Sequence, residues 1–164
     1  MHSPVAINRL LYASSLLVGS IVAAAPLCNN TTDVAGGSSP DFGLLSSIST
    51  SAIKDFQFAL FLENLEVSFF QAGLANITKW SANGYPNDTI EIVTKVTAQE
   101  EVHIATITDL LETYNAYPVP PCNYSFPVNS TEEFFELANI ITSVGIGATI
   151  GLSERLAITD PLLI

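Results

Sequence analysis

Apolar residues recur at helical spacing over three long segments of the chain, and this period limits its fold more than any other feature. The segments run from about residue 52 to 74, from about 89 to 114 and from about 130 to 158. The stretch between the last two, "NAYPVPPCNYSFPVN", is rich in proline and cannot be helical. No segment shows a convincing strand pattern. The sequence therefore predicts an all-α fold.

Residues with capping chemistry stand at the start of each predicted helix. Ser51 precedes the first helix. Asp88 precedes the second helix, and Glu91 follows Asp88 by three residues. Ser130 and Glu133 have capping-box spacing and open the third.

Size and charge limit the chain to one domain and few classes of partner. It has 164 residues, 48% of them hydrophobic and 13% charged, so one domain can bury a sizeable core. Asp and Glu number 16 against five Lys and Arg, which gives a net charge of −11. Nucleic acids and anionic lipid surfaces require basic patches, so we expect neither as a partner.

The first 24 residues have the pattern of a secretory signal peptide. A single basic residue, Arg9, precedes the apolar run "LLYASSLLVGSIVAAA", and small residues suit cleavage after Ala24. The alternative is an uncleaved membrane anchor, for which the run is short. Residues 25–48 are expected to form a flexible leader and residues 49–164 the helical domain. We therefore expect a secreted protein, either extracellular or in the cell wall.

Two further features agree with export. Cys28 and Cys122 would form a disulfide in an oxidising compartment if their geometry allows it, and two free thiols are the alternative. Six Asn-x-Ser/Thr acceptors for N-glycans occur in segments expected to be loops. These asparagines are Asn29, Asn30, Asn76, Asn87, Asn123 and Asn129.

Ionisable residues interrupt the apolar stripe of the second predicted helix. Its steps of three and four residues are typical of the side by which a helix packs on its neighbours. Glu100 and His103 stand in its middle, whereas Glu101 lies about 100° away around the helix. An inward carboxylate and imidazole are costly unless something pairs with them. The stripe consists of Val93, Val96, Glu100, His103, Ile107 and Leu110.

The first predicted helix has the same irregularity. Glu63 replaces an apolar residue in its stripe, and Glu66 follows one turn later. Buried glutamates on neighbouring helices repel one another unless they are protonated or bridged by a cation. The stripe consists of Phe56, Leu60, Glu63, Val67, Phe70 and Leu74.

These residue types predict a metal site. Glu-x-x-His with partner glutamates is the ligand pattern of di-iron and di-manganese carboxylate bundles. Carboxylate with imidazole suits iron or manganese. Glu100 and His103 have this spacing, and Glu63 lies at a matching depth. The alternative is a buried Glu–His pair that is hydrogen-bonded without metal.

The third predicted helix has an alternative of its own. Residues 137–153 carry no charge and include "GIGATIG", in which Gly147 and Gly151 allow close helix contact. These residues would span about 25 Å at the rise of a helix, which is short for a membrane. We expect a buried bundle helix, with a membrane helix as the alternative.

Several motifs resemble the secreted ferritin-like domain family abundant in fungi, some members of which are described as stress- or desiccation-related. They are "FALFLENLEVSFFQAGL", "EEVHIATI", "PPCNYSFP", "VGIGATIGL" and "ITDPLL". The resemblance implies a four-helix bundle whose proline-rich connection crosses its length between the second and third helices. It also implies that Glu63, Glu100 and His103 are metal ligands. Glu66 belongs to the same "LENLE" signature, so it is a fourth candidate ligand.

Two departures from the family pattern bear on function. Thr142 stands where the third helix should present a glutamate. The fourth helix, with a second Glu-x-x-His, should follow "ITDPLLI", where the chain stops. We therefore expect a bundle truncated to three of its four helices, with half a di-metal site.

Two functions agree with these features. The first is a metal-binding ferritin-like protein, with the question of enzyme activity open. The second is a secreted glycoprotein that keeps the bundle scaffold without metal. No phosphate loop, Cys-x-x-Cys pair or nucleophile elbow is present in the sequence. A homodimer through the first two helices would bring two half-sites together around one axis.

Overall fold

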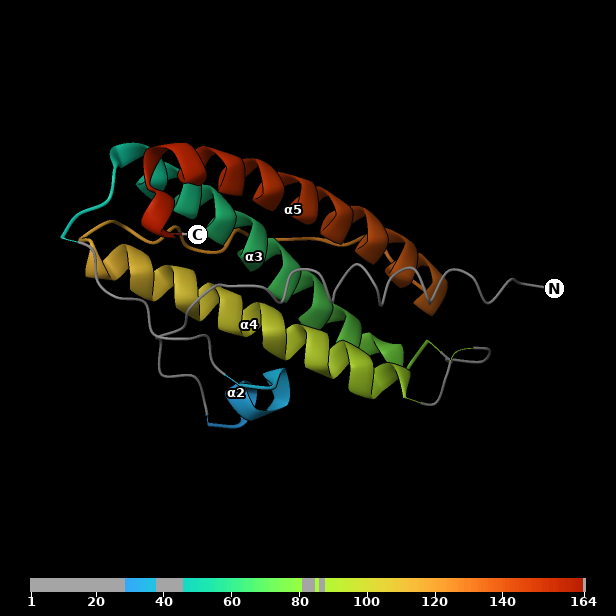
Figure 1. Ribbon diagram of the computed structural model, residues 1–164. Helices are drawn as coiled ribbons and strands as arrows, with labels where there is room; N and C mark the ends of the chain where they lie inside the picture. Colours follow the sequence, from blue (N-terminus) through green and yellow to red (C-terminus); the bar gives the residue numbers. More distant parts are fainter. Residues whose placement is uncertain (1–28, 38–45, 81–84, 86–87, 164) are drawn as a thin grey trace.

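The structure is a computed structural model, and it describes residues 29–37, 46–80, 85 and 88–163. Within these ranges the chain forms four α-helices and a 3-10 turn, with no strand, so the predicted all-α class is confirmed (Figure 1). The predicted signal peptide, Cys28 and Asn87 lie outside the described residues. The elements are α2 (Asn29–Ala35), α3 (Thr50–Ile77), α4 (Thr89–Thr113), α5 (Thr131–Thr159) and η1 (Pro161–Leu163).

Serine side chains cap two of the three long helices. Ser49 Oγ accepts a hydrogen bond from the backbone amide three residues on, at 3.0 Å. Ser49 rather than Ser51 is therefore the cap, and α3 begins two residues before the predicted start. Ser130 Oγ accepts from the Glu133 amide at 3.1 Å, which confirms the predicted cap of α5. Asp88 precedes α4 without a side-chain cap hydrogen bond.

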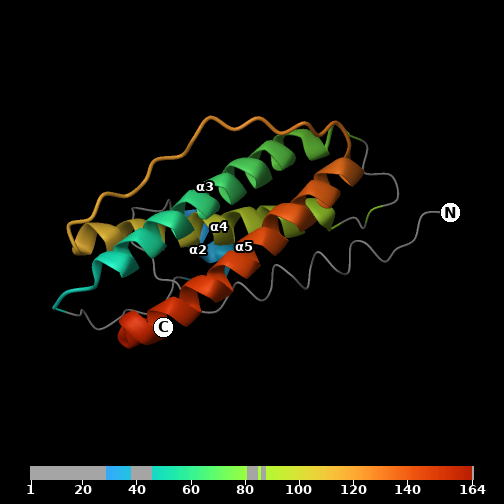
Figure 2. The ribbon, with the colours of Figure 1, turned by 90° about the horizontal axis from the view of Figure 1, so that it is seen from above.

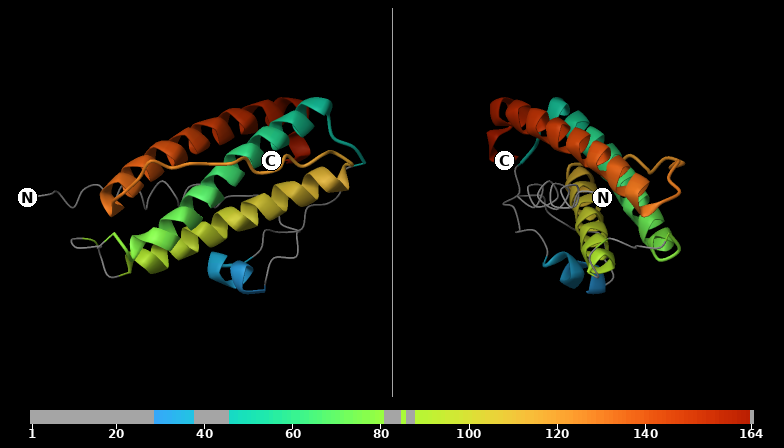
Figure 3. Two further views of the ribbon diagram at one scale, coloured as in Figure 1. Left: turned by 180° about the vertical axis from the view of Figure 1, so that it is seen from behind. Right: turned by 90° about the vertical axis from the view of Figure 1, so that its right-hand side faces the viewer.

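Helix α3 is central, because it packs against α4 on one side and α5 on another (Figures 1 and 3). Buried apolar side chains form two clusters along these contacts. The first contains Phe69, Phe70, Ile77, Val93, Val96, Phe134 and Ala138, and the second contains Ala59, Leu60, Ile107, Leu111 and Leu152. The interrupted parts of both predicted stripes fall between these clusters, so a buried polar layer separates two apolar ones.

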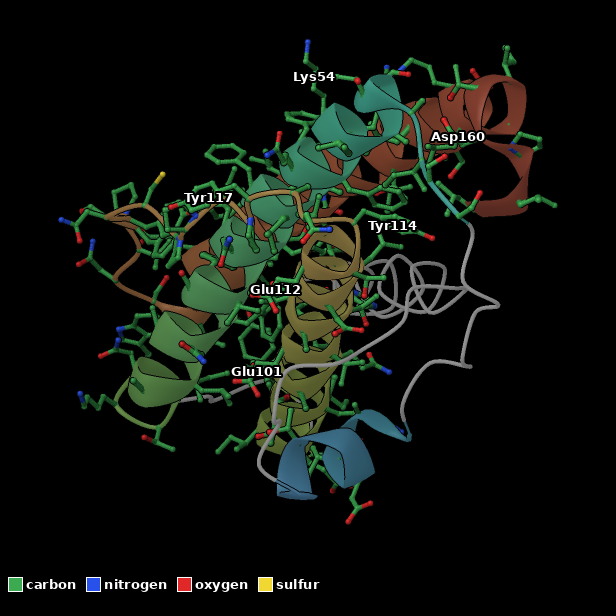
Figure 4. The ribbon with its side chains drawn as sticks, turned by 90° about the vertical axis from the view of Figure 1, so that its left-hand side faces the viewer. Lys54, Glu101, Glu112, Tyr114, Tyr117 and Asp160 are labelled. Atoms are coloured by element: carbon green, nitrogen blue, oxygen red, sulfur yellow. The ribbon has the colours of Figure 1, made fainter. Side chains whose placement is uncertain are left out.

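The proline-rich connection between α4 and α5 runs along α3, as the family resemblance implied (Figure 2). Gln57 Nε2 donates a hydrogen bond to the Tyr117 carbonyl at 2.8 Å, near the start of the connection (Figure 4). Asn64 Nδ2 donates to the Val119 carbonyl at 3.2 Å. These two amides of α3 satisfy carbonyls of a segment that has no helix of its own.

Helix α5 is buried mainly where it faces α3, so the expectation of a buried bundle helix holds for one side only. Gly147 and Gly151, expected at a close helix contact, have open space where a Cβ would stand. Within the described ranges, α5 is the one helix long and apolar enough to cross a membrane, and 22% of its most apolar window is buried. A single such helix is weak evidence for a span. The exposed apolar side chains of α5 are Ile140, Val144, Ile150 and Ile158.

Two further segments differ from the sequence prediction. The predicted leader contains α2, which lies against α4 (Figure 1). Helix α3 continues to the buried residue Ile77, so Asn76 lies in its last turn and not in a loop. Asn76 Nδ2 donates to the Ala72 carbonyl at 2.8 Å, one turn back in the same helix.

Candidate metal centre

Three side chains with metal-ligating atoms meet in the buried layer between α3 and α4. Glu63 comes from α3, while Glu100 and His103 come from consecutive turns of α4. His103 Nδ1 lies 2.7 Å from Glu100 Oε2 and 3.2 Å from Glu63 Oε2. The three residues are 7%, 3% and 7% exposed in chain order. One ligand atom from each lies within 4.8 Å of the other two.

Helical spacing explains why these three side chains face inward. Buried apolar residues precede and follow them at steps of three and four, and these carry the ionisable residues to the same side. Glu101, one position further, instead accepts a hydrogen bond from Gln71 Nε2 at 2.9 Å on the exposed side of the helix pair (Figure 4). The predicted inward orientation of Glu100 and His103 is confirmed, and so is the different direction of Glu101.

Glu66, the fourth candidate ligand, is buried beside this triad without belonging to it. It is 4% exposed, and its Oε2 is buried with no hydrogen-bond partner among the described residues. Its Oε1 points at α5, where a Cβ built on Gly145 would overlap it. The side chain therefore fills space between α3 and α5 that exists because residue 145 is glycine.

Helix α5 contributes no carboxylate to the layer within the described chain. Thr142 is buried one turn before Gly145, and its hydroxyl donates to the Ala138 carbonyl at 2.9 Å. Thr142 thus occupies, inside the core, the position at which the family pattern has a glutamate. The carboxylate that approaches α5 comes from α3 instead, as Glu66. The acids of α5 are all exposed: Glu132, Glu133, Glu136 and Glu154.

Sequence reasoning missed Gly145. The Gly-x-x-x-Gly spacing of the same helix instead favours Gly147 and Gly151 as the contact. Gly145 follows Ala138 and Thr142 at steps of four and three, which places the three residues on one side of the helix, but the sequence does not mark that side as the one that meets α3. Ala138, Thr142 and Gly145 are all buried.

Burial, hydrogen bonds and neighbouring charges raise the pKa values of Glu63, Glu66 and His103. Burial raises the pKa of Glu66 to about 9, and the charges of Glu100 and Glu63 add to the rise. Burial raises the pKa of Glu63 to about 7, although its hydrogen bond with His103 opposes the rise. Burial lowers the pKa of His103, but hydrogen bonds with Glu100 and Glu63 outweigh it and raise that pKa to about 10. Without a bound cation, His103 is the positive group and Glu66 holds a proton at neutral pH.

A comparison with known families decides which kind of protein this is. A family model described as a ferritin-like domain matches residues 51–162, which include most of α3 and all of α4 and α5. The chain belongs to the ferritin-like domain family. No curated protein and no solved structure matches it.

The residues of this ferritin-like domain fit a transition-metal ion. Two carboxylates and one imidazole are a donor set suited to iron or manganese. Bonds of about 2.1 Å place two ligands of one ion at most about 4.2 Å apart, so small side-chain movements from the present geometry suffice. Glu63, Glu100 and His103 would hold the ion, which when bound would supply redox or Lewis-acid chemistry in the core. Metal binding by these residues and by Glu66 stays a prediction.

Proposed function

We propose that the protein is a secreted ferritin-like glycoprotein that binds one iron or manganese ion through Glu63, Glu100 and His103. The observation that carries the proposal is their meeting from two helices inside a buried layer. A core of this size gains nothing in stability from an acid–imidazole cluster over apolar side chains of similar volume. The presence of such a cluster is explained if it binds a ligand.

The chemistry of the residues limits what this site does. Two carboxylates and a neutral imidazole carry two negative charges, which one divalent ion neutralises. His103 must release its proton before a ring nitrogen can ligate, because only the neutral imidazole offers a lone pair. Metal binding therefore displaces a proton from the cluster, and affinity should rise with pH.

A second function is favoured by a specific contact. His103 Nδ1 is within hydrogen-bond distance of both Glu100 and Glu63, so these three side chains can hydrogen-bond to one another without metal. The protein would then be a secreted scaffold that kept the bundle and lost the ion. Elemental analysis of protein purified without chelators separates the two functions, because only the first predicts iron or manganese near one per chain.

Secretion and glycosylation are part of the proposal and rest on sequence features. The signal-peptide pattern of residues 1–24 and the sequons support them. Asn123 and Asn129 are exposed on the connection along α3, where a glycan has room. Asn76 is a poorer acceptor, because its amide is already hydrogen-bonded within α3. N-terminal sequencing and glycopeptide mapping of protein from the culture medium test both points.

The cellular role and the assembly are also proposals. A place outside the cell or in the cell wall, and a role in stress response, are supported by the resemblance of the "LENLE" and "EEVHIATI" motifs to secreted fungal relatives. We further propose homodimers through α3 and α4, which would bring two Glu63–Glu100–His103 sets around one axis. Mass measurement in solution tests the dimer.

A further inference from the structure

Glu66 and Gly145 form a pairing that packing alone does not explain. A carboxylate oxygen buried without a partner costs free energy that an apolar side chain would not. Gly145 in the interior of α5 adds a cost of its own, because glycine is a poor helix former. Both costs fall at one place, where the glycine makes room for the carboxylate. The arrangement is understandable if Glu66 acts on something that binds in the layer.

The charges in the layer indicate which kind of ligand Glu66 would act on. Glu63, Glu66 and Glu100 are three buried carboxylates, and His103 is the one group among them that can be positive. Within the described chain no lysine or arginine reaches them. The lysines Lys54, Lys79 and Lys95 are exposed, and Arg155 pairs with Asp55 at 2.6 Å. An imidazole that ligates a cation is neutral, so the three buried carboxylates offer such a cation up to three negative charges.

We propose that the site is matched in charge to a trivalent cation, with Glu66 supplying the third negative charge from the space at Gly145. The proposal deepens the proposed function, because it names the charge of the ion that the same site prefers. A divalent ion is already neutralised by Glu63 and Glu100. A trivalent ion is neutralised only when the Glu66 carboxylate also faces it, and attraction at short range in a dry core is strong.

Glu66 does not need to bond to the ion to have this effect. It lies outside the group of three whose ligand atoms approach one another within 4.8 Å. The charges of Glu63 and Glu100 nevertheless act on it, so the four groups lie within electrostatic reach of one another. We therefore treat Glu66 as a positioning charge that selects between ions, and not as a catalytic residue.

The test compares two redox-inert cations on the purified chain. Zn²⁺ represents the divalent class, and Ga³⁺, supplied as its nitrilotriacetate complex, represents the trivalent class. Glu66→Gln keeps the shape of the protonated acid and cannot become negative. We expect it to weaken Ga³⁺ binding about tenfold and to leave Zn²⁺ binding within about twofold. Glu101→Gln, which removes a nearby charge outside the layer, should change neither affinity.

A second pair of variants displaces the Glu66 carboxylate by a substitution in α5. Gly145→Ala places a methyl group where Glu66 Oε1 lies and should produce the same selective loss of Ga³⁺ binding. Gly147→Ala is its control, because a Cβ there meets nothing within 4 Å. In the iron-loaded protein, a tenfold selective loss would appear as a reduction potential about 59 mV higher in Glu66→Gln.

The outcomes separate this inference from the proposed function. Selective loss of Ga³⁺ binding in Glu66→Gln, repeated in Gly145→Ala, supports the charge match. Equal weakening of both cations in Glu66→Gln, or no change in either, overturns it while leaving the metal site intact. A wild-type chain that binds neither Zn²⁺ nor Ga³⁺ refutes the metal site itself, a result visible before any variant is made.

Discussion

His103 Nδ1 lies 2.7 Å from Glu100 Oε2, one turn away on α4, and 3.2 Å from Glu63 Oε2 across the helix pair. The imidazole is therefore the only cationic partner of two buried carboxylates within the described residues. The stability of the metal-free protein depends on this one ring, because removing it leaves two acids in the core with nothing to neutralise them.

The first prediction concerns that dependence. His103→Ala should destabilise the metal-free protein by about 3 kcal/mol, because Glu63 and Glu100 lose their partner and the ring leaves a cavity. Denaturant unfolding in the presence of a chelator measures it. Glu101→Ala is the matched control and should cost less than about 1 kcal/mol, since it removes one exposed hydrogen bond to Gln71. Equal losses in the two variants would contradict the inward orientation of His103.

The second prediction concerns the coupling between Glu100 and His103 in the stability of the metal-free protein. Replacing both Glu100 and His103 with Leu should give a metal-free protein that is more stable than His103→Leu alone, because apolar packing replaces an unpaired buried acid. Thermal melts of the single and double variants decide it. A double variant less stable than His103→Leu would mean that Glu100 stabilises the fold independently of the ring.

The third prediction is a fall in stability as pH rises. The folded chain keeps protons on Glu63 and Glu66 up to about pH 7 and 9, whereas an unfolded glutamate releases its proton near 4.5. It keeps the His103 proton up to about pH 10, against 6.5 in the unfolded chain. The folded state thus binds more protons between pH 4.5 and 10, and its stability falls with rising pH. The metal-free protein should melt several degrees lower at pH 9 than at pH 5.

Glu66→Gln is the control for this pH dependence. It removes a group that resists ionisation, so its melting temperature should fall less steeply between pH 5 and pH 9 than that of the wild type. Parallel curves for the two proteins would show that the buried acids do not set the slope.

The fourth prediction concerns the contact between α3 and α5. A Cβ on Gly73 would overlap the ring of Phe134, so Gly73→Ala should destabilise the protein by about 1–3 kcal/mol. Gly147→Ala enters open space in the same bundle and should be neutral or stabilising by up to about 1 kcal/mol. Urea unfolding of both variants checks the pair. A Gly73→Ala protein as stable as the wild type would contradict this close approach.

The helices and the inward acids could be predicted from the sequence because helical spacing fixes both. Leu60, Glu63 and Val67 are three and four residues apart, so any core that buries the apolar pair also takes the glutamate. The same logic placed Glu100 and His103 inside and Glu101 outside. The fold class follows from these stripes and from the prolines of the connection.

The rotation of α5 and the short helix α2 could not be predicted in this way. Helix α5 is apolar or small on nearly every side, so its sequence does not mark which side meets α3. That is why Gly147 was expected at a contact that Gly145 makes. The polar sequence of α2 carries no amphipathic stripe, and the helix lies against α4, a contact that spacing along the chain does not reveal.

The decisive measurement is an anaerobic titration of the purified chain with ferrous iron, followed by calorimetry, beside His103→Ala under the same conditions. We predict about one ion bound per chain and a free energy of unfolding raised by about 2.7 kcal/mol at a hundredfold excess over the dissociation constant, with both effects absent in His103→Ala. A wild-type chain that binds no iron, or one whose binding survives His103→Ala, would contradict a metal centre at Glu63, Glu100 and His103.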